Sequence, residues 1–181
     1  MPMHVDPQGM VAEATQVPSP NCDPRPSGVL PELLVVHCIS LPPGKFGGGE
    51  ISALFTNTLD PGAHPYFREI AGLRASAHFL VRRGGELIQY VPCGMRAWHA
   101  GLSRWGTRNA CNDFSIGVEL EGTETAAFEP AQYRTLADLA ECLAGNYPLG
   151  AVLGHSDIAP GRKHDPGAGF DWPLLRSLVS F

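Results

Sequence analysis

The sequence predicts an α/β or α+β protein in which helices pack on a mixed β-sheet. A run of branched and aliphatic residues at positions 33–40 is typical of a buried strand. Residues 115–121 alternate between apolar side chains and polar or small ones, which indicates a strand with two different faces. Residues 130–145 carry leucines at helical spacing and indicate an amphipathic helix. Strands and helices interspersed in this way favour a sheet covered by helices.

The N-terminal residues 1–28 are polar and rich in proline. We expect them to form an extended arm with a short helix at residues 11–15. No internal repeat and no further change of composition follows the arm, so residues 29–181 are expected to form a single domain.

A long irregular segment, residues 41–66, follows the first predicted strand. It contains Pro42, Pro43 and three successive glycines, and only residues 50–56 are typical of a helix. Long irregular segments inside compact domains usually form lids or binding walls. We therefore expect this segment to line a cleft beside the end of the strand that carries His37.

The remaining elements are predicted from local signals. Two apolar runs joined at Gly84-Gly85 predict a β-hairpin. The amphipathic helix begins with proline, and Gly145 is a plausible residue just beyond its end. Asp171 is well placed to cap a last helix. The strands expected after the arm cover residues 33–40, 77–83, 86–92, 115–121 and 151–153.

Composition excludes several classes of protein. The chain has 181 residues, of which 44% are hydrophobic and 17% are charged, as in globular proteins. A formal net charge of −5, without any basic stretch, argues against a nucleic-acid partner. No apolar run approaches the ~18 residues of a membrane span, and the first residues lack the pattern of a secretory signal. We expect neither a nucleic-acid nor a membrane partner.

The five cysteines are an odd number and include no Cys-x-x-Cys pair. Free thiols in a reducing compartment explain this pattern better than a disulfide framework or a structural zinc site. The expected location is the cytoplasm, and the expected state is a monomer.

Residues 154–167 hold two histidines, two carboxylates and two cationic side chains among prolines and glycines. Proline fixes φ and glycine tolerates positive φ, so such a loop can hold its side chains in a defined arrangement. His155 and Asp165 would supply a nitrogen and an oxygen ligand, and a third donor would complete the set of a catalytic zinc. His37 is a candidate, because an imidazole in a buried strand is costly unless it is bonded or metallated.

Four segments together resemble a known family. They are VVHCISLPPG at 35–44, AWHAG at 97–101, NDFSIGVE at 112–119 and the loop at 154–167. In this order they resemble the zinc-dependent N-acetylmuramoyl-L-alanine amidases, which are related to the peptidoglycan recognition proteins. The resemblance runs from about residue 17 to residue 170. It implies a central mixed sheet flanked by helices, with a zinc cleft on one face.

The resemblance also assigns the catalytic residues. It implies that His37, His155 and Asp165 bind Zn²⁺ and that Asp157 belongs to the loop. His164 could compete for the metal, but adjacent side chains usually diverge, so we expect it at the surface. Periodicity leaves Glu119 and Glu121 open as the general base, and the resemblance selects Glu119. It further implies that Lys163 stabilises the oxyanion that forms when water adds to the amide.

Substrate contacts are less well defined by the sequence. Arg74 and Arg108 are candidates, because guanidinium groups pair with the carboxylates of a stem peptide. Trp98 could stack on the sugar or the peptide, and its neighbour His99 could equally be a bonded structural histidine. Family members often carry a basic residue directly before the cysteine that corresponds to Cys111, where this chain has Ala110.

The resemblance implies hydrolysis of the amide between the lactyl group of 1,6-anhydro-N-acetylmuramic acid and L-alanine, in cytoplasmic cell-wall recycling. The partner would be a soluble anhydro-muropeptide. One alternative is a non-catalytic muropeptide-binding protein, against which the complete set of ligands and catalytic residues argues. The other is an amidase that acts on intact peptidoglycan, against which the lack of a signal segment or wall-binding repeat argues.

Overall fold

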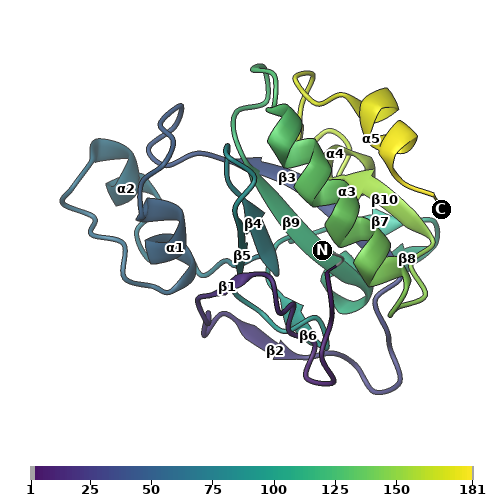
Figure 1. Cartoon of the computed structure of the whole chain (residues 1–181). Coiled ribbons are helices and arrows are strands. Elements are labelled where there is room, and N and C mark those ends of the chain that lie inside the picture. Colours follow the sequence, from purple (N-terminus) through teal and green to yellow (C-terminus); the bar gives the residue numbers. More distant parts are fainter. Residues whose placement is uncertain (1–2, 181) are drawn as a thin grey trace.

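The computed structural model describes residues 3–180. At its centre lies a mixed six-stranded sheet with the order β1-β5-β4-β9-β3-β10 (Figure 1). Neighbouring strands from β4 to β10 run parallel, whereas β5 is antiparallel to β4. The predicted mixed sheet and the predicted hairpin are thereby confirmed. The strands of this sheet are Thr15–Gln16 (β1), Leu33–Ile39 (β3), Phe79–Val81 (β4), Leu87–Gln89 (β5), Ser115–Glu121 (β9) and Ala151–Gly154 (β10).

The register of the parallel strands brings chemically important residues together. In the pairing of β3 with β9, His37 is the direct partner of Glu119. On the other side of β3, Gly154 at the end of β10 pairs with Val36. The carboxyl ends of these three strands therefore lie side by side, which is where open sheets of this kind place their ligand sites.

Two helices, α3 (Pro130–Ala144) and α5 (Trp172–Leu178), cover one face of the sheet (Figure 1). Asp171 caps α5 as predicted, since its Oδ1 accepts from the N–H of Leu174 at 2.9 Å. Gly145, expected just beyond the end of this helix, is the C-cap of α3 and keeps a helical φ of −70°. The core under these helices is formed by Leu34, Val36, Ile116, Val118, Leu120, Leu136, Leu139 and Leu143.

The opposite face is covered by short helices and irregular chain. Helix α1 (Glu50–Phe55) confirms the helix expected within residues 41–66. Helix α2 (Pro65–Glu69) was not predicted; His64 caps it by accepting from the N–H of Tyr66 at 3.1 Å. Figure 1 shows α1 and α2 together, away from α3 and α5. The remaining elements are β2 (Cys22–Pro24), β6 (Met95–Ala97), β7 (Arg104–Trp105), β8 (Arg108–Asn109), the 3₁₀ helix η1 (Cys111–Phe114) and α4 (His155–Ile158).

The N-terminal arm is attached to the body at several points. The helix expected at residues 11–15 is wrong; these residues form turns that lead into β1. Pairing with distant parts of the chain explains this: Thr15 lies opposite Ile88 of β5, and the N–H of the buried Val11 donates to the Gln89 side chain at 2.7 Å. The guanidinium of Arg25 donates to backbone carbonyls of Cys93, Asn112, Asp113 and Ser115. The boundary drawn at residue 28 stays a prediction.

Among residues 3–180, no helix has the length and apolar character needed to cross a membrane.

Candidate metal centre and active-site cavity

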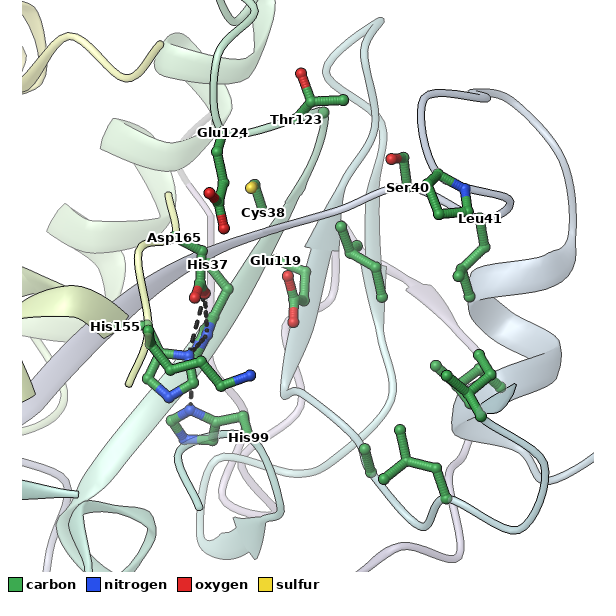
Figure 2. Close-up of a pocket in the computed structure, with 18 of the residues that line it drawn as sticks. His37, Cys38, Ser40, Leu41, His99, Glu119, Thr123, Glu124, His155 and Asp165 are labelled. Atoms are coloured by element: carbon green, nitrogen blue, oxygen red, sulfur yellow. Dashed lines mark hydrogen bonds and ion pairs between the residues drawn. The ribbon is translucent and has the colours of Figure 1, made fainter. Parts of the chain in front are cut away.

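Three potential metal ligands converge at the carboxyl end of the sheet. His37 comes from β3, His155 is the first residue of α4, and Asp165 lies in the loop that follows. The Nδ1 atoms of the two histidines are 3.0 Å apart. Asp165 Oδ2 lies 3.0 Å from Nδ1 of His37 and 3.1 Å from Nδ1 of His155. Figure 2 shows the three side chains pointing at one another, as the sequence analysis expected of a ligand set.

The hydrogen bonds of His155 indicate what occupies the centre of this triangle. Its Nε2 lies 3.0 Å from the carbonyl of Ala100, which can only accept, so Nε2 carries the proton. The lone pair on Nδ1 of His155 therefore faces Nδ1 of His37 and the carboxylate of Asp165. Converging lone pairs repel each other unless a cation lies between them. Two imidazoles and one carboxylate are a ligand set of catalytic zinc, whose bonds of about 2.0–2.2 Å suit donor atoms at this mutual spacing.

The electrostatics of the cluster agree with a cation site. Burial alone would raise the pKa of Asp165, but the adjacent imidazoles of His155 and His37 outweigh burial and lower that pKa. Burial lowers the pKa of His37, and the adjacent carboxylate of Asp165 opposes this. An ionised carboxylate beside a neutral imidazole is the protonation state that binds a metal.

Glu119 lies beside the cluster, on the strand next to His37 (Figure 2). Its Oε2 atom is buried and has no hydrogen-bond partner among residues 3–180. Burial raises the pKa of Glu119 well above its usual value, the charge of Asp165 raises it further, and Lys163 opposes both effects. A carboxyl group of this kind can exchange a proton with a bound water or substrate near neutral pH.

Glu121, the alternative base, is already committed to structural contacts. Its carboxylate accepts from the N–H of Gly47 at 2.7 Å and pairs with Arg82 at 3.2 Å. It is 2% exposed and does not line the cavity described next. Among the two carboxylates on β9, Glu119 alone can take a proton from a group bound at the cluster.

The cluster opens into a cavity of about 600 Å³, a size typical of small-molecule sites. One wall is polar and carries the cluster together with Glu119, His99 and Lys163. The opposite wall is largely apolar and confirms that residues 41–66 line the cleft. This apolar wall includes Leu41, Pro43, Leu54, Phe55, Tyr66, Ile70 and Leu73.

Comparison with known proteins settles the family. Residues 27–168 match the family model described as N-acetylmuramoyl-L-alanine amidase. The chain belongs to this family. It is 59% identical over 175 residues to the 1,6-anhydro-N-acetylmuramyl-L-alanine amidase AmpD of Escherichia coli strain K12, covering 96% of each chain. The predicted family is confirmed, and the chain is an N-acetylmuramoyl-L-alanine amidase, a hydrolase of an amide bond.

Two solved structures extend the comparison. A crystal structure of a selenomethionine AmpD derivative matches with a TM-score of 0.96 at 57% identity, over 98% of this chain and 100% of that one. The amidase AmiD from E. coli, solved with anhydro-N-acetylmuramic acid-L-Ala-D-γ-Glu-L-Lys as substrate, matches with a TM-score of 0.61 at 29% identity. That match covers 87% of this chain and 62% of AmiD. The amidase fold predicted from the sequence is confirmed.

The candidate substrate contacts of the amidase differ in position. Trp98 lines the cavity, half-buried. Arg74 is exposed and lies outside the residues that line it, although Leu73 and Ala75 on either side belong to it. Arg108 also lies outside the cavity lining; its guanidinium pairs with Glu32 at 2.7 Å and lies 3.7 Å over the ring of Phe114, and its contact with substrate stays a prediction. Both partners come from outside the cavity lining, so this cation is used in packing.

Four residues that lie near the ligands in the sequence are not among the three that converge. Asp157 accepts from the N–H of Gly154 at 2.7 Å and so stabilises the start of α4. The guanidinium of Arg162 donates to the carbonyls of Ala100 and Leu102, so it is structural. His164 is exposed at the cavity. Cys38 packs against the core beneath α3 and is not part of the three-residue cluster.

Sequence reasoning did not foresee the position of His99. It was considered as a bonded structural histidine, but its Nδ1 lies 2.8 Å from Nε2 of His37. The signal that could have indicated this contact is Gly117 in β9. A Cβ atom there would lie 2.4 Å from Cγ of His99, so the strand leaves room for the ring.

Proposed function

We propose that the chain is a zinc-dependent amidase that releases L-alanyl peptides from 1,6-anhydro-N-acetylmuramic acid in cell-wall recycling. The observation that carries this proposal is the convergence of His37, His155 and Asp165 beside the unpartnered carboxylate of Glu119, inside one cavity. The similarity to AmpD over nearly the whole chain supports the anhydro sugar as the substrate. The five free cysteines support a reducing compartment, the cytoplasm.

The residues present fit zinc and define the steps of the reaction. When bound by His37, His155 and Asp165, zinc lowers the pKa of a bound water towards ~7 and polarises the scissile carbonyl. Glu119 accepts a proton from the attacking water at its carboxylate and returns it to the nitrogen of the departing L-alanine. Lys163 lines the same cavity and stabilises the developing oxyanion with its ammonium group.

Two side chains at or near the cavity are proposed to contact the substrate. Trp98 offers an aromatic surface beside His99 for the sugar or the first peptide residues. Arg74 stands near the apolar wall, where a flexible guanidinium could reach a carboxylate of the stem peptide. Arg108 is the less favoured candidate for this role, because its guanidinium pairs with Glu32 and lies over the ring of Phe114.

The test is mass spectrometry after incubation of the purified protein with an anhydro-muramyl tripeptide, and separately with intact peptidoglycan. We expect free tripeptide from the soluble fragment, its loss on chelation and its recovery with Zn²⁺. Release from intact peptidoglycan alone would reassign the protein to wall remodelling. No release from either substrate by the zinc-loaded protein would contradict the amidase mechanism.

An Asp165→Ala variant separates the enzyme from a non-catalytic receptor. Because Asp165 supplies one of three ligands, we expect zinc content to fall and release of tripeptide to drop to the level of the chelated protein. Calorimetry with the same tripeptide measures whether the fragment still binds. A receptor would bind the fragment without turnover in the unmodified chain, and that result would overturn the proposed function.

A further inference from the structure

A chain of hydrogen bonds leads from the metal cluster into the body of the protein. Nε2 of His37 lies 2.8 Å from Nδ1 of His99, and Nε2 of His99 lies 3.1 Å from Oγ of Ser115. The hydroxyl of Ser115 in turn lies 2.6 Å from the carbonyl of Cys111. Figure 2 shows His99 on the side of His37 that faces away from Asp165.

The direction of every bond in this chain is fixed by its last member. The carbonyl of Cys111 can only accept, so the single hydroxyl proton of Ser115 is donated to it. Ser115 Oγ must then accept from Nε2–H of His99. A neutral imidazole has one N–H, so Nδ1 of His99 is an acceptor and receives Nε2–H of His37. The lone pair on Nδ1 of His37 therefore faces His155 and Asp165.

The surroundings of the ring support a neutral His99. Its hydrogen-bond partners are a histidine and a serine, and it has no hydrogen bond to a carboxylate within residues 3–180. The ring therefore has the one donor and one acceptor that the chain of bonds requires.

The position of His99 is built into the sheet as well. The ring lies over Gly117 on β9, where a Cβ atom would come within 2.6 Å of Nδ1. The two ligand histidines thus have the same tautomer, but different groups set it. For His155 the partner is the backbone carbonyl of Ala100, whereas for His37 it is a replaceable side chain.

We propose that His99, oriented by Ser115 and seated over Gly117, is a positioning residue that fixes the tautomer of His37 for metal binding. Second-sphere partners of ligand histidines are usually carboxylates, backbone carbonyls or water, and their loss typically lowers metal affinity 10–100-fold. Here the backbone carbonyl of Cys111 fixes the tautomer of His37 through two side chains, those of Ser115 and His99. This inference rests on the metal centre of the proposed function.

The first experiment measures zinc affinity by competition with a chromophoric chelator at pH 7.5. We expect the affinity to fall about 10–100-fold in His99→Phe, which keeps the ring volume but accepts no hydrogen bond. His99→Asn should recover most of the loss, because its Oδ1 can accept from Nε2–H of His37 near the place of Nδ1. Ser115→Ala should lower the zinc affinity by a smaller factor. The ring of His99 remains in place, but without Ser115 it can also adopt the tautomer with the proton on Nδ1.

Ser19→Ala is the matched control for Ser115→Ala. Ser19 is also buried, donates to a backbone carbonyl, that of Phe55, and lies outside the cavity lining. We expect Ser19→Ala to lower the melting temperature of the metal-free protein without changing zinc affinity. Equal zinc affinity of His99→Phe and the unmodified protein, with both folded, would overturn the proposed role.

The second experiment reads the tautomers directly in the metal-free protein and needs no variant. Long-range ¹H–¹⁵N correlation spectra of ¹⁵N-labelled histidines distinguish a protonated Nε2 from a protonated Nδ1. We expect protonated Nε2 on His37, His99 and His155. Protonated Nδ1 on His99 would contradict the chain of bonds even if zinc binds. Failure of the unmodified protein to bind zinc, with the expected tautomers present, would instead contradict the proposed metal centre.

Discussion

The two faces of the central sheet treat buried polar groups differently. Under α3, the buried side chain of Gln132 donates to the carbonyls of Val81 and Glu121, at 3.2 and 3.0 Å. On the cavity face, Oε2 of Glu119 is buried without a partner within residues 3–180. One face therefore satisfies its polar atoms from within the chain, and the other leaves donors and acceptors for a metal and a substrate.

The unpartnered Oε2 of Glu119 lowers the stability of the fold at the site proposed for catalysis. An unsatisfied buried polar group costs about 1–3 kcal/mol, so it persists only where binding or catalysis uses it. Glu121, two residues along β9 from Glu119, is the more buried of the two, and it accepts from Gly47 and Arg82. The presence of partners, and not greater exposure, distinguishes the structural carboxylate from the proposed base.

The largest effect is expected from Glu119→Gln, which removes the proton acceptor and keeps the size of the side chain. We expect kcat for the anhydro-muramyl tripeptide to fall about 10²–10⁴-fold, while zinc content stays at that of the unmodified enzyme. Chromatographic assay of the released tripeptide, together with metal analysis of the same sample, measures both quantities.

Glu121→Gln is the matched control on the same strand. It removes the ion pair with Arg82 but keeps an acceptor for Gly47, so it should lower the free energy of unfolding by about 1–3 kcal/mol. Its kcat, measured on the folded enzyme, should stay close to that of the unmodified chain. A loss of kcat in Glu121→Gln as large as in Glu119→Gln would contradict the assignment of the base.

On the face covered by α3, we expect a substitution to lower the stability and to leave zinc binding unchanged. Leu139 on α3 is fully buried in the core. Leu139→Ala should lower the free energy of unfolding by about 2–5 kcal/mol, through lost burial and the cavity left behind. Urea unfolding of the chelated protein measures this. Zinc affinity of the folded variant should be unchanged, and a parallel loss of affinity would show that the two faces are coupled.

Much of the fold could be predicted from the sequence because its signals are local. The alternation in β9, the leucine stripe of α3 and the cap at Asp171 each depend on neighbours within a few residues. The cavity wall formed by residues 41–66 followed from its irregular composition. The turn at residues 11–15 could not be predicted, because the strand that pairs with Thr15, β5 at Ile88, is far away in the sequence.

The residues of the candidate site, too, could be predicted only in part from the sequence. His37, His155 and Asp165 were identified from motifs, and the structure brings them together. The pairing of Arg108 with Glu32 could not be predicted, because Glu32 is 76 residues distant and carries no motif. The contact of His99 with His37 depends on the register of β3 and β9 and on space above Gly117. Such contacts become visible only when the strands are placed.

The last prediction concerns His78, a buried polar residue on the cavity side of the sheet. Unlike Glu119, it finds its hydrogen-bond partners within the protein. It is fully buried, its Nδ1 accepts from the N–H of Gly117 at 3.0 Å, and its Nε2 lies 3.0 Å from the carbonyl of Met95. Burial, followed by the charge of Arg25, lowers the pKa of His78 from 6.5 to about 3. Both nitrogens are satisfied inside the protein, so His78 should affect stability and not metal binding.

The sign of the pH dependence follows from this shift. Between pH 6.5 and pH 3 the unfolded chain binds a proton at His78 that the folded chain does not bind, so stability falls as the pH falls. The loss at pH 5 should be about 2 kcal/mol relative to pH 8. His78→Gln, which can still accept from Gly117 and donate to Met95, should lack this component. Urea unfolding of both chelated proteins at pH 8 and pH 5 measures this component. If the two proteins differ in free energy of unfolding by the same amount at both pH values, His78 is protonated in the folded state at pH 5, which would contradict the prediction.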